Sequence, residues 1–282
     1  MTDCFVPVLT VAGSDSGGNA GAQADCRAFR AFGLHACTAI SSLTAQNPRG
    51  VAAVHVPPAD FLAAQLDAIF EAVSPRAAKT GMLATAECVR LVASRLRARR
   101  REMPAVVDPV MVATSGAPLL EPDAIRAVAS DLLSAAALAT PNVPEAETLS
   151  GMRIRGVDGM AAAARQLRRD AGCAVLVKGG HLAGADASRD VLVCNEGEFL
   201  LESPAVPSPA SVHGTGCTLS AAIAASLALG RSLPDAVREG KAFVYEAILR
   251  SRPVPHASSV LGVPEVSGLL SHPAVSMRPL AV

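Results

Sequence analysis

Short apolar runs alternate with segments of helical period along most of this chain, and no other feature constrains its fold as strongly. Apolar residues that recur every three or four positions, as from Leu62 to Val73, indicate helices with one face on a core. Strands that alternate with such helices predict an α/β fold with a parallel sheet. The candidate strands are Val6–Val11, Cys37–Leu43, Ala77–Thr80, Ala105–Val110, Leu138–Thr140, Ala174–Lys178 and Val191–Cys194.

One further segment predicts an antiparallel edge on this sheet. Glu198–Leu201 follows the turn sequence Asn195-Glu196-Gly197, directly after the last candidate strand. Two strands joined by so short a turn form a hairpin. We expect one domain over the whole chain 1–282, with a core of about residues 5–265. Repeated prolines predict an irregular tail over 252–282.

The composition excludes several classes of partner. Half of the 282 residues are hydrophobic, and 25 Lys and Arg balance 25 Asp and Glu. Without a net positive field or a tryptophan, nucleic acid is not an expected partner. The longest apolar run, Leu219–Leu229, is too short to span a bilayer, so no membrane is expected either. Seven cysteines without a C-x-x-C pair, and no basic N-terminal segment, predict a cytoplasmic protein with reduced thiols.

The segment His213–Thr218 is the most informative local pattern. Two glycines, Gly214 and Gly216, stand directly before a helix of small residues, so main-chain N–H groups and the helix dipole can converge on an anion. Cys217 in the first helical turn has its thiolate favoured and could take a proton from an attacking hydroxyl. The alternative is a tight loop with Cys217 as a small buried residue.

A second glycine-rich segment, Ala12–Gly21, joins the first strand to a helix. Ligands of open α/β sheets bind at such turns, although this one could be a turn and nothing more. Neither G-x-G-x-x-G nor G-x-x-x-x-G-K-[ST] occurs in the chain, so both common nucleotide fingerprints are absent. The histidines also lack a zinc-binding spacing.

Polar residues follow the ends of three further strands. Asn47, Asp108 and Lys178 each end or follow an apolar run, where burial would be costly unless they face a cleft. Lys178 could hold phosphates and Asp108 could orient a metal ion or water. Thr140–Glu145 indicates a helix start, with Glu145 either favourable in the first turn or close to a metal. Each of these residues could instead be a structural cap.

Taken in order, these motifs resemble the ribokinase-like superfamily, and within it the hydroxymethylpyrimidine/phosphomethylpyrimidine kinases of thiamine biosynthesis. The resemblance covers about residues 8–250 and implies a three-layer α/β/α fold with a central, mostly parallel sheet and an antiparallel edge hairpin. It also implies ATP, Mg²⁺ and a homodimer. The matching stretches are 12–15, 21–25, 43–47, 79–83, 107–111, 140–146, 177–181 and 213–218.

The resemblance further implies a role for particular residues. Gln46 would hydrogen-bond the aminopyrimidine edge, Met82 and Val110 would pack on the ring, and Gly13 and Asp25 would lie beside it. Gly214, Thr215 and Gly216 would form the anion hole, with Cys217 as base and Lys178 on the ATP phosphates. The residues around the nucleotide and Mg²⁺ would be Asp108, Asn142, Glu145, Lys178 and Lys241, with Asp108 and Glu145 near the metal.

Two other functions fit the same residues. A pyridoxine or pyridoxal kinase of vitamin B6 salvage would phosphorylate a similar flat ring that bears a primary alcohol, although Gln46 and Met82 favour the pyrimidine. A non-catalytic ligand-binding protein of this fold is the second alternative. The joint presence of Asp108, Lys178 and Gly214–Cys217 argues against it, because a binding module has no need of transfer machinery.

Overall fold

The central sheet is parallel in its middle and antiparallel at both ends. In the computed structural model, residues 4–47, 50–112, 116, 119–180, 182, 188–206, 213–253 and 259–280 are described. The parallel strands are β1 (Pro7–Asp15), β2 (His35–Asn47), β4 (Ala78–Thr80), β5 (Ala105–Val107), β6 (Leu138–Ala139) and β7 (Ala174–Lys178). The antiparallel strands are β3 (Gly50–His55), β8 (Arg189–Cys194), β9 (Gly197–Glu202) and β12 (Ser276–Pro279). Their order across the sheet is β12-β9-β8-β7-β6-β5-β4-β1-β2-β3.

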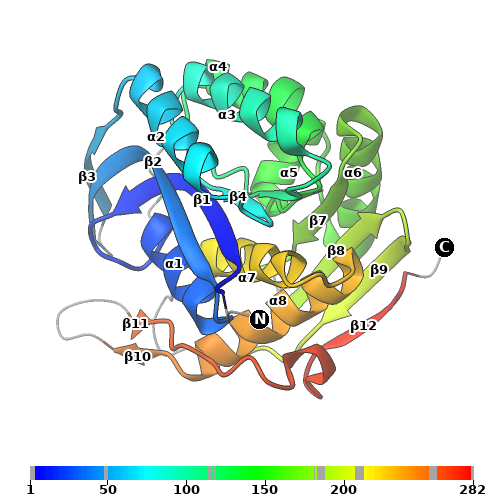
Figure 1. Cartoon of the computed structure of the whole chain (residues 1–282). Helices are drawn as coiled ribbons and strands as arrows, with labels where there is room; N and C mark the ends of the chain where they lie inside the picture. The colour runs from blue at the N-terminus through cyan, green and yellow to red at the C-terminus, as the bar shows by residue number, and fades with distance from the viewer. Residues whose placement is uncertain are drawn as a thin grey trace.

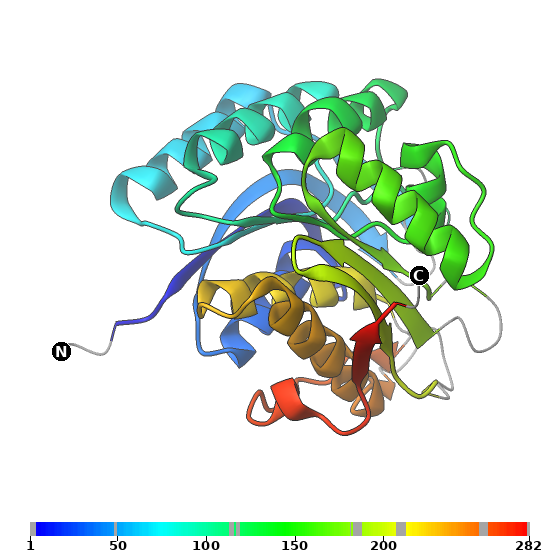
Figure 2. The same cartoon turned by 90° about the vertical axis from the view of Figure 1, so that its right-hand side faces the viewer.

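Helices cover both faces of the sheet, which gives three layers (Figures 1 and 2). One face carries α1 (Gly21–Ala31), α7 (Thr215–Ala228) and α8 (Leu233–Leu249). The other carries α2 (Ala59–Ala72), α3 (Ala86–Arg99), α4 (Pro122–Ala127), α5 (Val143–Ser150) and α6 (Gly156–Ala171), with the short helices η1 (Val128–Leu132) and η2 (Leu133–Ala135). A further turn, η4 (Leu269–Ser271), and a small pair of strands, β10 (Arg252–Pro253) and β11 (Ser259–Val260), lie near the C-terminus.

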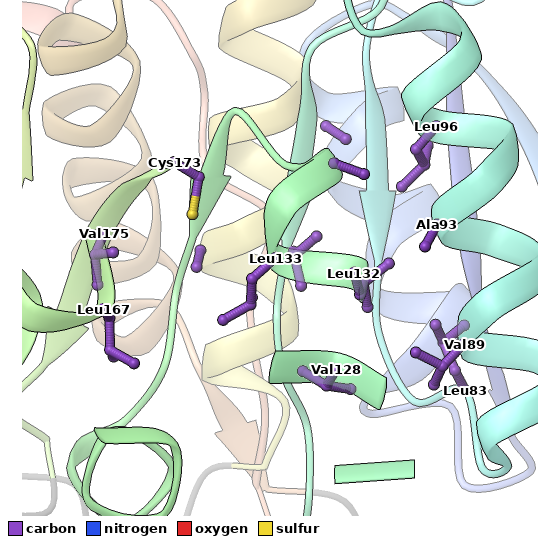
Figure 3. Packing of buried hydrophobic residues seen from close by; sticks show 14 of the residues in the cluster. Leu83, Val89, Ala93, Leu96, Val128, Leu132, Leu133, Leu167, Cys173 and Val175 are labelled. Atoms are coloured by element: carbon purple, nitrogen blue, oxygen red, sulfur yellow. The ribbon is translucent and has the colours of Figure 1, made fainter. Parts of the chain in front are cut away.

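The alternation of strand side chains divides the core in two. On β1, Val8 packs among α1, α7 and α8, whereas Leu9 and Val11 pack on the opposite side of the sheet. Figure 3 shows part of the second cluster, where Leu96 of α3 lies near Leu132 and Leu133. Because the central strands are buried on both faces, their sequences are continuous apolar runs and do not alternate between apolar and polar residues.

The predicted α/β fold, the parallel sheet and the edge hairpin β8–β9 are confirmed. Sequence patterns missed β3, which pairs antiparallel with β2 and has mostly exposed side chains. The prediction of an irregular tail is wrong for residues 276–279, because β12 pairs with β9 from Ser276↔Glu202 to Pro279↔Phe199. No helix in the described ranges is both long and apolar enough to cross a bilayer.

Candidate active site

A cavity of about 790 Å³ opens at the carboxyl ends of the parallel strands. Each of the six strands supplies lining residues at or just after its end, as Gly13 does on β1, Met82 after β4 and Asp108 after β5. This volume lies within the range of roughly 300–1,000 Å³ that small-molecule sites occupy. The position is where open α/β sheets bind ligands, because the loops that leave parallel strands all meet at one edge.

Four of the residues expected around a flat ring line this cavity. Gly13, Gln46, Met82 and Val110 all line it, together with Thr44. The main chain of Gln46 is fixed by a side chain of the β1–α1 loop, since Ser16 Oγ lies 2.9 Å from Gln46 N and 2.8 Å from Gln46 O. Gln46 Oε1 accepts from Thr44 Oγ1 at 3.3 Å. The sequence therefore placed these four residues together correctly.

Asp25 is not in this lining, contrary to the expectation that it lies beside the ring. Its carboxylate is fully buried, 2.9 Å from Lys79 Nζ and 2.6 Å from Thr10 Oγ1. Thr10 and Lys79 are register partners on β1 and β4, so both side chains point to the face that α1 covers. Burial lowers the pKa of Lys79, but the charge and hydrogen bond of the Asp25 carboxylate, together with the charges of Cys217 and Asp108, outweigh burial and raise the pKa. Asp25 thus joins α1 to the sheet beneath the cavity.

The loop between β1 and α1 is organised by a single carboxylate that sequence analysis did not select. Asp15 is buried, and its side chain accepts N–H bonds from Gly17, Asn19 and Ala20 at 2.8–2.9 Å. These bonds satisfy main-chain groups ahead of α1, so the loop has one defined shape. An aspartate that closes a glycine-rich turn is the signal that could have identified it.

The N-terminus of α7 lies at the cavity, where the sequence predicted an anion site. Gly214, Thr215 and Gly216 line the cavity, and the first intrahelical bond runs from Thr218 N to Gly214 O. The N–H groups of residues 215–217 have no acceptor in the helix ladder, and they lie at the positive end of its dipole. Gly214 has a φ of +85°, and a Cβ there would come within 1.9 Å of Asn19 O. Only glycine allows α7 to approach the loop before α1 so closely.

Cys217 also lines the cavity, but the pKa of its thiol is raised, whereas its place at the helix start predicted a lowered pKa. Burial raises the pKa of Cys217; the Lys79 ammonium opposes this, while the carboxylates of Asp25 and Asp108 add to it. The resting side chain is therefore a thiol at neutral pH rather than the favoured thiolate expected from its place in the first turn.

Two charged side chains, Lys178 and Asp108, lie close to Gly216 at the start of α7. Lys178 Nζ lies 2.8 Å from Asp108 Oδ1, and Ser220 Oγ donates to Asp108 Oδ2 at 3.4 Å. Burial opposes the charge of Lys178, but Asp108 and Glu145 outweigh it and raise its pKa. Ser220 stands four residues after Gly216 on α7, and this helical spacing could have indicated it from the sequence.

Asn142 and Glu145 form a capping box at the start of α5. Asn142 Oδ1 accepts from Glu145 N at 2.9 Å, and Glu145 Oε2 accepts from Asn142 N at 2.8 Å. Both residues line the cavity, so the structural cap lies where the sequence predicted a site. Burial raises the pKa of Glu145 to about 7, with Lys178 lowering it and Asp108 raising it.

Lys241 lines the cavity from α8 and is held by an ion pair. Its Nζ lies 2.6 Å from Asp190 Oδ2 and 3.0 Å from Ser188 O, and Asp190 Oδ1 accepts from Gly179 N. Asp190 has no nearby sequence signal, because it lies 51 residues before its partner. The motif residue His181 lies outside the described residues.

An apolar wall lies in this part of the cavity. Leu219, Val206, Val244, Tyr245 and Ile248 line it beside Lys241. Tyr245 and Ile248 stand four and seven residues after Lys241, so they share one face of α8 with it. This helical spacing is the sequence signal that could have indicated the wall.

In the described part of the chain, no cluster of three or more His, Cys, Asp or Glu side chains could hold a metal ion. Asp108 and Glu145 nevertheless offer two carboxylates that line the cavity and interact electrostatically with Lys178. Mg²⁺ commonly binds one or two carboxylates and completes its shell with phosphates and water. The raised pKa of Glu145 indicates a buried carboxylate that a cation would stabilise. These donors fit Mg²⁺ bound together with a phosphate ligand.

A family model and a relative in that family both match most of this chain. The family model described as Phosphomethylpyrimidine kinase matches residues 15–260. A hydroxymethylpyrimidine/phosphomethylpyrimidine kinase from Rhizobium meliloti (strain 1021) is 47% identical over 85% of this chain and 89% of that protein.

Two solved structures are similar to this one. The phosphomethylpyrimidine kinase from Clostridium difficile 630 has a TM-score of 0.75 and 38% identity, covering 86% of this chain and 99% of that one. An ADP complex of pyridoxal kinase from Bacillus subtilis has a TM-score of 0.82 and 33% identity, covering 92% and 98%. Both alternatives for the acceptor ring are thus represented among proteins of the same fold.

We predict that Gly214→Ala will destabilise the protein far more than Gly230→Ala. Both glycines have φ near +85°, which costs an L-residue about 1–2 kcal/mol, but nothing lies within 4 Å of a Cβ at Gly230. The added cost at Gly214 comes from the clash with Asn19 O. Urea unfolding of the two variants measures the difference, and equal losses would show that α7 does not depend on this close approach.

We predict that Glu145→Gln will become more stable relative to wild type as the pH rises. The folded-state pKa of Glu145 is raised to about 7 from 4.5, so ionising it destabilises the fold. The wild type loses this contribution between about pH 4.5 and 7 and has lost all of it above, whereas glutamine never ionises. We expect the stability difference to change by about 1–3 kcal/mol between pH 5 and 8 in urea unfolding. Glu71→Gln, at an exposed position of α2, is the control; a difference independent of pH would contradict the prediction.

Proposed function

This chain belongs to the phosphomethylpyrimidine kinase family, and we propose that it transfers the γ-phosphoryl group of ATP to 4-amino-5-hydroxymethyl-2-methylpyrimidine and then to the monophosphate, in thiamine biosynthesis. The family membership and the ribokinase-like fold agree with the prediction from the motifs. The observation that carries the proposal is the N-terminus of α7, which lies in one cavity between a ring-binding half and a half lined by Lys178 and Lys241.

The ring-binding half suits the pyrimidine. Gln46 can hydrogen-bond the ring nitrogen and the amino group, because a carboxamide offers both a donor and an acceptor. Met82 and Val110 offer apolar surface to the two faces of a flat ring, and Gly13 lets main chain come close to it. The Ser16 bonds fix the main chain of Gln46, and Thr44 Oγ1 contacts its carboxamide at 3.3 Å before substrate binds.

Phosphoryl transfer requires charge stabilisation more than covalent chemistry. The main-chain N–H groups of Gly214–Gly216 meet the transferring group, and they need no reorganisation because the helix fixes them. Lys178 holds the ATP phosphates, exchanging its contact with Asp108 for phosphate oxygens. Lys241 and Asn142 bind the nucleotide, which lies against the apolar wall of Tyr245 and its neighbours.

Asp108 and Glu145 would hold Mg²⁺, which when bound supplies positive charge to the β- and γ-phosphates. Asp108 directly follows β5 and Glu145 lies on α5, and both carboxylates interact electrostatically with Lys178. Burial and the negative charge of Asp108 both raise the pKa of Glu145 in the free protein, and a bound cation would offset both.

Cys217 takes the proton of the attacking hydroxyl. The oxygen attacks the γ-phosphorus, the bond to ADP breaks, and the proton passes to the thiolate late in a loose transition state. Cys217 is a thiol in the resting protein, and only its thiolate can accept a proton. Its activity as a base therefore depends on the fraction of thiolate, which rises with pH.

We also propose a cytoplasmic homodimer in which the whole chain works as one kinase domain. All seven cysteines are free, which suits a reducing compartment. Every described strand except β10 and β11 belongs to one sheet. Leu43 and Val54 are 49% and 42% exposed on the β2–β3 hairpin at the sheet edge, and covering them against a second copy would remove apolar surface from water.

Pyridoxal phosphorylation remains the second candidate, because the similarity to the Bacillus subtilis pyridoxal kinase extends over 92% of this chain. The anion site and the apolar wall would serve either acceptor. Gln46 is the group that favours the pyrimidine, since its carboxamide matches adjacent ring nitrogen and amino groups.

We predict that the protein with ATP and Mg²⁺ phosphorylates the hydroxymethylpyrimidine and its monophosphate in preference to pyridoxine, pyridoxal and pyridoxamine. Gln46→Ala should lower kcat/KM for the pyrimidine roughly 10–100-fold, because one or two hydrogen bonds are lost. ADP formation and product masses measure both effects. Gln166→Ala, on α6 away from the cavity, is the control. Turnover of pyridines alone would assign the protein to vitamin B6 salvage, and no turnover at all would favour a binding protein.

We predict that Cys217→Ala keeps part of the activity but changes its pH dependence. In the wild type, kcat/KM should rise as pH increases and thiolate forms, whereas the variant, lacking the titrating thiol, should show a flatter profile. Cys88→Ala, buried on α3, controls for the loss of a cysteine. Rates in Cys217→Ala that equal those of wild type at every pH would contradict the assignment of the base.

A further inference from the structure

The C-terminal segment Leu261–Leu280 lies just beyond the residues matched by the family model, which end at 260. Figure 1 shows it passing along α8 and then reaching the outer edge of the sheet beside β9. It is anchored by buried apolar side chains, among them Leu261, Leu269 and Val275. The segment is therefore part of the folded molecule, and its contacts can be followed to the active-site cavity.

Its first contact is with α8. Gly262 N donates to Ala247 O at 3.0 Å, and His272 Nε2 lies 3.0 Å from Glu246 Oε1. The His272 ring meets the Tyr245 ring edge to face, with centroids 5.6 Å apart and an interplanar angle of 67°. Tyr245 itself lines the cavity. One side of this tyrosine thus faces the C-terminal segment and another faces the site.

Its second contact is with β9. The strand β12 pairs with β9 along its whole length, and Arg278 Nε donates to Glu202 Oε2 at 3.1 Å. The four residues that directly follow β9, 203–206, line the cavity. The C-terminal segment therefore joins the two walls of one half of the cavity, α8 and the continuation of β9.

His272 is held in a single orientation. Ala274 N donates to His272 Nδ1 at 3.2 Å, so Nδ1 is an acceptor and Nε2 carries the hydrogen that is donated to Glu246. Both ring nitrogens are therefore hydrogen-bonded, and only 16% of the side chain is exposed. A ring fixed in this way restricts the positions that Tyr245 can take.

We propose that the C-terminal segment belongs to the nucleotide-binding site, and that His272 is the positioning residue that holds Tyr245 against the base of the bound nucleotide. The proposal rests on the proposed function in one respect, that a nucleotide occupies the half of the cavity between Lys178 and Tyr245. His272 touches no substrate. Its effect passes through Tyr245, so it acts on nucleotide affinity rather than on phosphoryl transfer.

The test compares nucleotide affinity with turnover in three variants of the full-length protein. His272→Ala should raise the Kd for ADP and the KM for ATP about 3–10-fold, the size of an aromatic pair interaction. kcat and the KM for the pyrimidine should stay within about two-fold. His272→Phe keeps a ring edge toward Tyr245 and should recover part of the affinity. His35→Ala, at an exposed position on β2, is the control for loss of a histidine.

A double-mutant cycle separates positioning from general loosening of the fold. Tyr245→Leu should weaken ADP binding, and adding His272→Ala to it should have little further effect, because the group that His272 positions is gone. If the two substitutions lower ADP affinity additively, the proposal is overturned. Unchanged ADP affinity in folded His272→Ala, or an equal rise in the KM values of ATP and the pyrimidine, would also overturn it.

Calorimetric titration with ADP alone distinguishes this proposal from the proposed function. If the wild type binds ADP but phosphorylates no pyrimidine, the acceptor assignment fails and the comparison of ADP affinities still decides the role of His272. A wild type that does not bind ADP would overturn both.

Discussion

A fully buried ion pair, Asp25 with Lys79, connects the elements on which the active site is built. Asp25 lies on α1, Lys79 on the central strand β4, and Thr10 of β1 donates to the same carboxylate oxygen. Removing one partner of such a pair leaves an uncompensated charge in the core, which is far costlier than losing a surface contact. The pair therefore fixes α1 on the sheet. Because α7 approaches the loop before α1 at Gly214, the orientation of α1 also determines where the anion site lies.

Charge in the cavity is balanced before any ligand arrives. Lys178 is shared between Asp108 and Glu145, so two carboxylates face one ammonium, and burial leaves Glu145 partly protonated near neutral pH. A phosphate that recruits Lys178 would leave both carboxylates without their cation. Binding of a metal ion together with the nucleotide would restore the balance, which gives an electrostatic reason for the two to bind jointly.

The sequence predicted those parts of the structure that local chemistry determines. Strand ends and glycine-rich turns have a local cause, so Gly13, Gln46, Asp108, Lys178 and Gly214 were correctly expected at one edge of the sheet. Contacts between distant segments were missed. Lys79 lies 54 residues from Asp25, and no periodicity indicates that a lysine inside an apolar strand has a buried partner. The edge strands β3 and β12 are short and mostly exposed, so their pairing leaves no apolar pattern. The expectation of a favoured thiolate at Cys217 left out burial, which raises the pKa of this thiol.

The choice between two acceptor rings depends on a small part of this cavity. Main-chain N–H groups at the start of α7 recognise a phosphoryl group and are indifferent to the ring that carries the alcohol. Apolar contacts from Met82 and Val110 discriminate weakly between flat rings of similar size. A carboxamide is different, because a ring that offers no matching donor and acceptor leaves it unpaired on binding, which is costly. Gln46 can act in this way only if it cannot turn aside; its main chain is fixed by two hydrogen bonds with Ser16 Oγ, and its Oε1 accepts from Thr44 Oγ1. On the proposed function, specificity for the pyrimidine therefore depends on the β1–α1 loop as much as on Gln46 itself.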